Sequence, residues 1–189
     1  MGIEVLFLLI LLVFETAFFL LAVFILASGL ISSIKGAPYV PLPRKSIKRI
    51  LEFAEIKDSA DFYDLGCGDG RILIEAVKTF GIRSAAGYEI SPWPYLKAKF
   101  LVRRLGFEDK IKILRQNFLQ TDLSKAGIIF IYLYPKAVQK LTLKFSQELK
   151  SAAKIISVSF PINNPEKFNL ELLKSQKLDR FTVYLYEKF

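Results

Sequence analysis

Hydrophobic residues are concentrated at the amino end of the chain, in one nearly unbroken run. From Ile3 to Ile31 the run is interrupted only by Glu15, Thr16 and a few small residues. A helix needs about 20 apolar residues to cross the hydrocarbon core of a bilayer, and this run is longer. A cleavable signal peptide would start with Lys or Arg and have a shorter apolar core, whereas no basic residue precedes this run. The pattern therefore predicts a retained single-span membrane anchor within residues 1–34.

A proline-rich segment separates the apolar run from the rest of the chain. Pro38, Pro41 and Pro43 restrict their own backbone and that of the residues before them, which excludes a helix. We expect residues 35–45 to form an extended strap. Beyond it, apolar residues at positions 47, 50, 51 and 54 follow the spacing of a helix face, and they open a domain that is predicted to span residues 46–189.

From residue 60 on, short apolar runs alternate with stretches of helical periodicity. Strands are expected at residues 61–65, 85–89, 111–114, 127–133, 154–159, 170–177 and 181–188. Helices are expected between them at residues 71–80, 92–105 and 135–150. Strands that alternate with helices in this way build a parallel sheet with helices on both faces. The predicted fold class is α/β, a Rossmann-like, doubly wound and mostly parallel sheet preceded by one transmembrane helix.

Composition excludes several kinds of protein. The chain has 189 residues, with 27 Lys and Arg, 18 Asp and Glu, one Cys and no His. The single Cys67 excludes a disulfide scaffold. The absence of histidine excludes Cys/His zinc sites and Ser–His or Cys–His catalysis, and no metal is expected. With 17 Phe and 8 Tyr, the chain has enough aromatic residues for a core, which excludes disorder.

Charge is distributed unevenly along the chain, and this distribution orients the predicted anchor. Residues 1–34 hold two acids and no base, so the remaining chain has a net charge of +11. Basic residues follow the apolar run closely, at Lys35, Arg44, Lys45, Lys48 and Arg49. Positive charge stays on the cytoplasmic side of a membrane, so we expect a cell-membrane protein whose carboxyl-terminal domain faces the cytoplasm. Nucleic acid is not an expected partner, because the Lys and Arg residues do not form a nucleic-acid-binding motif.

Glu15 lies near the middle of the predicted span. A charged carboxylate at that depth costs about 2.5–3.5 kcal/mol on insertion scales. Two interpretations stay open: Glu15 is protonated, or it pairs with a polar group on another membrane helix. The second would make Glu15 and Thr16 a docking point for a membrane partner.

The candidate chemistry lies in a glycine-rich turn between the first strand and the first helix of the α/β pattern. Residues 64–71 read DLGCGDGR, and open α/β sheets bind their ligands at the carboxyl ends of the strands. A dinucleotide fingerprint, GxGxxG, would need glycine where the chain has Arg71. Asp64 and Asp69 bracket the turn, which disfavours a polyphosphate and suits a cationic ligand.

S-adenosylmethionine fits these features, because it carries a sulfonium and an ammonium group. Gly66, Gly68 and Gly70 have no Cβ, so the methionine part of the ligand can lie against the backbone. Glu89 ends the second expected strand, where a carboxylate can accept from both ribose hydroxyls. The sequence therefore predicts S-adenosylmethionine as the cofactor, and a structural turn without a ligand is the alternative.

DLGCGDGR followed by YEISP resembles the first two motifs of class I S-adenosylmethionine-dependent methyltransferases. The wider pattern resembles the membrane-anchored protein-lysine methyltransferases, on four segments: PYVPLP after an apolar helix, YDLGCGDGRILIEA, FLQTDLSKAGIIFIYLYP and IISVSFP. That family includes the ATP synthase c-subunit and adenine nucleotide translocase lysine methyltransferases. The resemblance covers the apolar run and residues 36–161.

The resemblance implies roles for individual residues. Asp64, Gly66, Gly68 and Gly70 would line the methionine part of the cofactor, Glu89 would hold the ribose, Ile90 would pack on the adenine, and Asn117 with Phe118 would lie at the adenine amino group. Tyr134 first, and then Tyr132, would line the channel of the acceptor amine, because aromatic faces suit a sulfonium and a lysine. The alternative is that each tyrosine simply packs at a strand end.

Two positions depart from this family. Asn117 stands in place of an acid, although its carbonyl can still accept a hydrogen bond, and Val158 stands where family members often carry His. The implied function is methyl transfer to an amine, above all a lysine side chain of a membrane protein. A lipid or quinone methyltransferase, and a catalytically degenerate protein that binds cofactor without turnover, stay open as alternatives.

Overall fold

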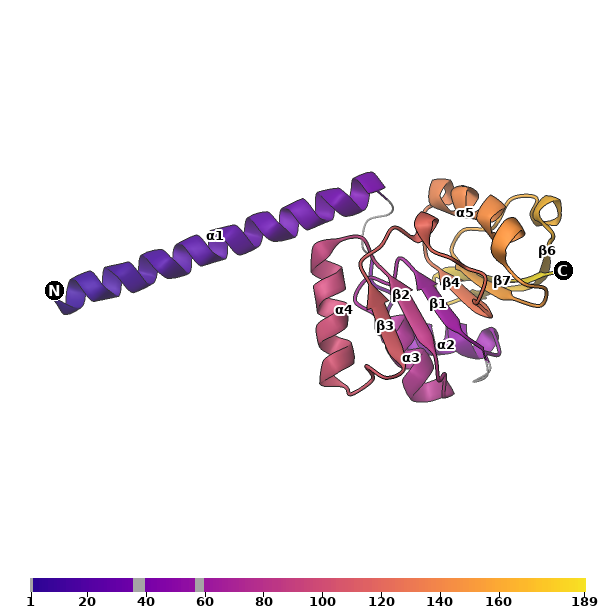
Figure 1. Ribbon diagram of the computed structural model, residues 1–189, viewed down its shortest axis with the longest axis horizontal. Coiled ribbons are helices and arrows are strands. Elements are labelled where there is room, and N and C mark those ends of the chain that lie inside the picture. Colours follow the sequence, from indigo (N-terminus) through magenta and orange to yellow (C-terminus); the bar gives the residue numbers. More distant parts are fainter. Residues whose placement is uncertain (1, 36–39, 57–59) are drawn as a thin grey trace.

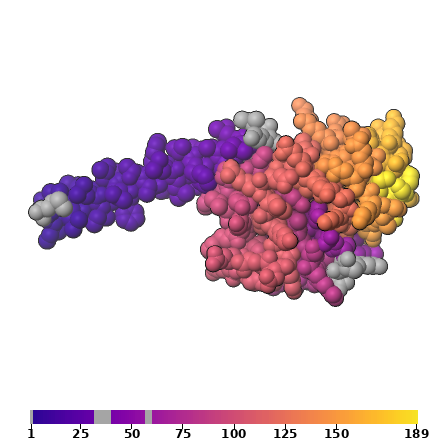
Figure 2. Space-filling model, in the orientation of Figure 1, coloured from indigo at the N-terminus to yellow at the C-terminus, as the bar shows by residue number. Residues whose placement is uncertain are grey.

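The chain begins with one long helix and continues into an α/β domain (Figure 1). The computed structural model describes residues 2–35, 40–56 and 60–189. The first helix, α1 (Ile3–Lys35), projects from the domain as a rod (Figure 2), and most of its large apolar side chains are exposed. Its segment Ile3–Ile31 is long and apolar enough to cross a membrane. The helix is confirmed, and a membrane around it stays a prediction.

The α/β domain follows the predicted alternation of strands and helices. Its helices are α2 (Arg44–Phe53), α3 (Arg71–Phe80), α4 (Pro92–Arg104) and α5 (Pro135–Glu148), with short 3₁₀ helices η1 (Phe118–Gln120) and η2 (Pro165–Phe168). Its strands are β1 (Phe62–Leu65), β2 (Ala85–Tyr88), β3 (Ile111–Leu114), β4 (Ile128–Ile131), β5 (Lys154–Val158), β6 (Leu170–Leu178) and β7 (Phe181–Lys188). The predicted elements are confirmed, and their ends differ by at most two residues.

Within the described residues, seven strands form one sheet in the order β3-β2-β1-β4-β5-β7-β6. β1 to β5 are parallel, whereas β7 lies antiparallel between β5 and β6. The order reverses between β1 and β4, so the chain is wound in both directions from the centre. The predicted doubly wound, mostly parallel sheet is therefore confirmed. A crevice is expected outside the carboxyl ends of β1 and β4, where such folds bind ligands.

The sheet separates two apolar layers, and neighbouring strand residues point alternately into them. In β5, Ile155 belongs to the layer under α5, whereas Ile156 belongs to the layer under α2 and α3. Both side chains are completely buried. Burial on both faces explains why the central strands read as continuous apolar runs rather than as alternating ones.

The carboxyl-terminal hairpin contacts α2, the helix that follows the strap. Asp179, in the turn between β6 and β7, accepts a hydrogen bond from Ser46 Oγ at 3.0 Å and pairs with Arg49. α2 begins at Arg44, two residues before the predicted domain start. Residues 40–43 have no helical structure, as predicted for the strap, while residues 36–39 lie outside the described part of the chain.

We expect Asp179→Ala to lower the free energy of unfolding by about 1–2 kcal/mol, because it removes one charged acceptor shared by two partners on α2. Asp179 also adopts a φ of 56°, which Asp and Asn tolerate better than Ala. Urea unfolding of the full chain in detergent measures the loss. Asp179→Asn is the matched control, since it keeps an acceptor and the turn conformation, and equal losses in both variants would contradict this role.

Candidate active site

A pocket opens at the carboxyl ends of β1, β2 and β4. Its volume is about 660 Å³ when the part open to solvent is counted. The wall consists of Val40, Pro41, Leu42, Asp64, Gly66, Cys67, Gly68, Asp69, Arg71, Ile72, Tyr88, Glu89, Ile90, Phe118, Phe130, Tyr132 and Leu133. Seven of these are sequence-predicted site residues, and they come from four separate stretches of the chain.

The glycine turn crosses the floor of this pocket in a conformation that favours glycine. Gly66, Gly68 and Gly70 have φ values of 88°, 55° and 75°, a region that costs other residues about 1–2 kcal/mol each. The N–H groups of Gly66 and Cys67 both donate to the Tyr88 carbonyl, at 2.9 and 3.1 Å. The turn that follows β1 is thereby fixed to the end of β2.

Glu89 makes the second connection between these two strand ends. One of its carboxylate oxygens accepts from the Gly68 N–H at 3.0 Å, and the other accepts from the Ser91 N–H at 2.8 Å. The side chain is buried and lines the pocket. Because each carboxylate oxygen accepts more than one hydrogen bond, Glu89 retains capacity for donors on a ligand.

Asp64 is a buried acid of the turn with one unpartnered carboxylate oxygen. It is 2% exposed, and its Oδ2 has no hydrogen-bond partner among the described residues. Burial, with Glu89 and Asp69 nearby, raises the pKa of the Asp64 carboxyl well above its usual range. A buried polar atom without a partner is costly. A cationic hydrogen-bond donor in the pocket would satisfy this oxygen, which agrees with the ligand chemistry predicted from the sequence.

Asp69, the other predicted acid of the turn, has a different role. Its carboxylate accepts from Arg71 at 2.7 and 2.6 Å and also pairs with Lys97 at 3.0 Å. Two cations therefore compensate the charge of Asp69 within the protein. Asp69 lines the pocket together with Asp64, but its charge is paired within the protein, so Asp64 and Glu89 are the acids left for a cationic ligand.

Arg71 also connects the strap to the pocket, a role that sequence reasoning missed. Its Nη1 donates to the Leu42 carbonyl at 2.9 Å, and residues 40–42 form part of the wall. The proline run indicated an extended linker only. The available signal was Leu42, a single large apolar residue between two prolines, which is 2% exposed in the structure.

The two candidate acceptor-site tyrosines occupy different positions. Tyr132 lines the pocket and packs edge-on against Phe181, with ring centroids 5.9 Å apart. Tyr134 is not among the lining residues; it is 47% exposed and lies 6.1 Å from the Phe160 ring. The sequence ranked Tyr134 first, whereas the geometry favours Tyr132.

Three further positions lie outside the pocket wall. Gly70 starts α3, and a Cβ there would come within 3.3 Å of Ala98, so its role in the structure is close helix packing. Asn117 Oδ1 accepts from the Leu119 N–H at 3.0 Å and thereby caps η1. Val158 is completely buried in the core. The neighbouring predicted residues Ile90 and Phe118 do line the pocket.

The sheet order, the GxGxG turn and the acid after β2 together define a class I S-adenosylmethionine-dependent methyltransferase. A solved RNA methyltransferase from Salinibacter ruber, in complex with S-adenosyl-L-homocysteine, is similar to the chain with a TM-score of 0.72 and 30% identity. The match covers 78% of this chain and 93% of that structure. The cofactor is therefore S-adenosylmethionine.

The chain belongs to the ANTKMT methyltransferase family, whose domain matches residues 64–168. It is 35% identical over 158 residues to a protein-lysine N-methyltransferase of Saccharolobus islandicus, covering 82% of this chain and 96% of that protein. It is 31% identical over 127 residues to the ATP synthase c-subunit lysine N-methyltransferase of Xenopus laevis, covering 67% of this chain. The chain matches about half the length of this animal relative, 55%.

We expect Gly66→Ala to weaken S-adenosylmethionine binding much more than Gly106→Ala does. Both positions have positive φ, but a Cβ at Gly66 would lie 3.0 Å from Leu133 Cδ2, whereas nothing lies within 4 Å at Gly106. Both variants carry the backbone strain of about 1–2 kcal/mol, and only the first disturbs the pocket wall. Calorimetric titration measures the affinities, and an equal loss in both variants would count against the placement of the pocket.

Asp64→Asn tests the unpaired acid. We expect it to weaken S-adenosylmethionine binding about tenfold to a hundredfold, since hydrogen bonds to charged groups contribute about 1.5–3 kcal/mol. In the unsubstituted protein a raised pKa keeps the Asp64 carboxyl protonated at low pH, so binding a cation must release that proton. Affinity should therefore rise with pH until the raised pKa is passed, and this component should vanish in Asp64→Asn. The same pH profile in both proteins would exclude Asp64 as the charge partner.

Proposed function

We propose that the protein methylates lysine side chains of membrane-associated proteins, using S-adenosylmethionine as the methyl donor. The observation that carries this proposal is the unpaired, buried Asp64 beside Glu89 in a pocket with an aromatic wall at the end of β4. The name of the Saccharolobus relative, which covers 82% of this chain, supports lysine as the acceptor.

The cofactor would be held by residues from the two strand ends. Asp64 would receive its ammonium group, the turn at Gly66 and Gly68 would lie against its methionine part, and Glu89 would accept from its ribose hydroxyls. Ile90 and Phe118, both in the pocket wall, would flank the adenine. Gly70 and Asn117 would act indirectly, by setting the start of α3 and the shape of η1.

The acceptor would enter past Tyr132. When bound, S-adenosylmethionine supplies a methyl group on a positively charged sulfur, so the acceptor must present an uncharged nitrogen. Tyr132 and the neighbouring Phe181 and Phe130 give an aromatic and apolar wall that excludes water and favours the neutral amine. The chain has no histidine, so we propose that the lysine loses its proton to bulk water before it enters the apolar part of the pocket. Tyr134 would guide the approaching side chain from its exposed position.

The proposed layout is an anchor at residues 1–34, a strap at residues 35–45 and a catalytic domain at residues 46–189. α1 would span the cell membrane, with the domain on the cytoplasmic side, where the basic residues after the span favour it. Leu42, in the pocket wall, comes seven positions after Lys35, at most about 25 Å away even in an extended chain. The anchor would thus keep the pocket close to the bilayer and raise the effective concentration of membrane substrates.

The deciding experiment gives the full chain, in native membranes, S-adenosylmethionine with a labelled methyl group. We expect the label in protein, and acid hydrolysis should release it as methyllysine. Tyr132→Ala should lose most of this transfer while it keeps cofactor affinity within about threefold, because the proposed cofactor contacts come from Asp64, the glycine turn and Glu89 and not from the Tyr132 side chain.

Three other outcomes would contradict the proposal. Label that extracts with lipid would indicate a lipid or quinone substrate. Label that is lost on ribonuclease treatment would indicate RNA, the substrate class named for the Salinibacter structure. Cofactor binding without any transfer to native membranes would indicate a protein that has lost turnover. Gly66→Arg is the negative control for label in protein, lipid and RNA and for cofactor binding, since the arginine side chain would fill the pocket floor.

A further inference from the structure

α4 has apolar residues on two opposite sides, and only one of them faces the protein. Pro94, Ala98 and Val102 are buried against the domain. Trp93, Leu96 and Phe100 are 39%, 50% and 61% exposed. These three are spaced by three and four positions, so they form one stripe along the outer side of the helix. Contiguous exposed apolar patches mark interaction sites.

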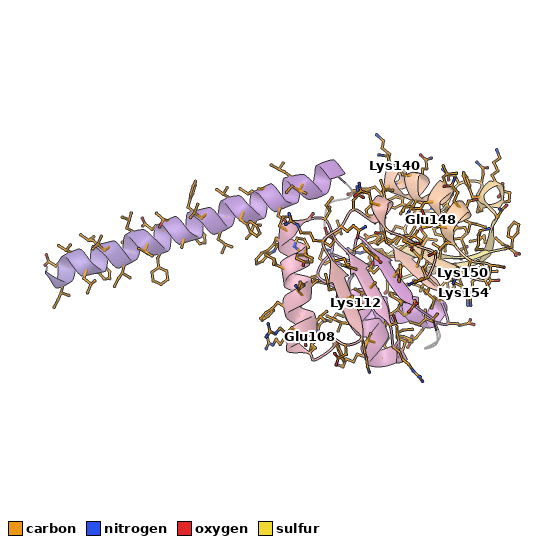
Figure 3. The ribbon with its side chains drawn as sticks, in the orientation of Figure 1. Glu108, Lys112, Lys140, Glu148, Lys150 and Lys154 are labelled. Carbon is orange, nitrogen blue, oxygen red and sulfur yellow. The ribbon has the colours of Figure 1, made fainter. Side chains whose placement is uncertain are left out.

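Basic residues border this stripe on both sides. At 100° per residue, Lys99 and Arg103 flank it on one side and Arg104 and Lys97 on the other. Lys99, Arg103 and Arg104 are exposed, while Lys97 pairs with Asp69. An acidic residue, Glu108, lies beyond the end of α4 that is farther from α1 (Figure 3). Its Oε1 is 3.8 Å from Arg103 Nε. The outer surface of α4 is therefore apolar along its centre and positively charged along its edges.

α4 begins in direct contact with α1. The backbone N–H of Trp93, in the first turn of α4, donates to Ser28 Oγ of α1 at 2.9 Å. Ser28 is 2% exposed. From this contact α4 runs across the direction of α1, along the side of the domain from which α1 projects (Figure 1). The part of α1 before Ser28 is about 37 Å long at 1.5 Å per residue, enough for a hydrocarbon core of about 30 Å.

We propose that the outer face of α4 lies on the surface of the lipid bilayer that α1 crosses, and that it binds anionic headgroups there. This inference rests on the proposed membrane span of α1. A membrane crossed by α1 up to Ser28 would have its surface along α4, because the two helices meet there. A helix with an apolar stripe and basic edges inserts shallowly at such a surface, lysine and arginine reach the headgroups, and tryptophan favours this depth.

The consequence for the enzyme is a fixed orientation. A domain tethered only by its strap could rotate freely at the end of α1. A second attachment along α4 holds the domain against the bilayer, and Glu89 and Ile90 of the pocket immediately precede this helix. The pocket would then keep one height and one direction relative to substrates in the same membrane.

The test uses tryptophan as the reporter, because Trp93 is the only one in the chain. In a Trp93→Phe background, single tryptophans are introduced by Phe100→Trp, Phe14→Trp or Leu143→Trp. The full chain is reconstituted in vesicles of phosphatidylcholine and phosphatidylglycerol with brominated acyl chains, which quench tryptophan on contact. Leu143 is the matched control, since it is 56% exposed beside lysines on α5, a helix on the other side of the domain from α4 (Figure 1).

We expect quenching at positions 14 and 100 and none at position 143. Quenching at position 100 should fall at least twofold without phosphatidylglycerol or with Arg103→Glu and Arg104→Glu together, while position 14 stays unchanged. Quenching at position 14 alone would overturn the role of α4 and leave the anchor intact. Emission from position 100 that is shifted to the blue without quenching would mean that protein covers the stripe, and no quenching at positions 14 and 100 would overturn both membrane proposals.

Discussion

The hydrogen bonds between the turn after β1 and the end of β2 are the constraint on which the site depends. Gly66 and Cys67 donate to the Tyr88 carbonyl, and Gly68 donates to Glu89. Such close approach requires backbone conformations that glycine adopts easily. It also requires Gly87 in β2, since a Cβ there would lie 2.7 Å from Cys67 Sγ and 2.5 Å from Leu73 Cδ1. With the turn fixed in this way, Asp64 is buried at the pocket floor with one oxygen unpartnered.

Charge compensation then divides the three acids of the site into two kinds. Asp69 is paired with Arg71 and Lys97 and serves the architecture, because Arg71 extends to the strap carbonyl of Leu42. Asp64 and Glu89 have no cationic side chain as a partner in the described contacts, and both line the pocket. The Asp69–Arg71 pair thus connects the turn to the strap, whereas Asp64 and Glu89 remain able to accept hydrogen bonds from a cationic ligand. This division explains why the pocket suits a sulfonium donor.

The order of the elements could be predicted from the sequence, and seven of the ten predicted site residues line the pocket. Strand and helix periods are local signals, and the glycine turn with Glu89 has a spacing that few ligands fit. What could not be predicted depends on contacts between distant segments. The pairing of Lys97 with Asp69, the place of Leu42 in the pocket wall and the different positions of Tyr132 and Tyr134 all follow from tertiary packing. The outer stripe of α4 was hidden for the same reason, because only burial shows which apolar side of a helix faces the core.

The central claim is that a buried, unpaired aspartate receives the cationic end of the methyl donor. Difference infrared spectroscopy on the full chain tests it most directly, by following the protonated carboxyl band of Asp64 as S-adenosylmethionine is added. Because burial raises the pKa of this carboxyl, we expect, at a pH below that raised pKa, a band in the free protein that disappears on binding and that Asp64→Asn lacks. A band that stays unchanged when the cofactor saturates the site would contradict the claim.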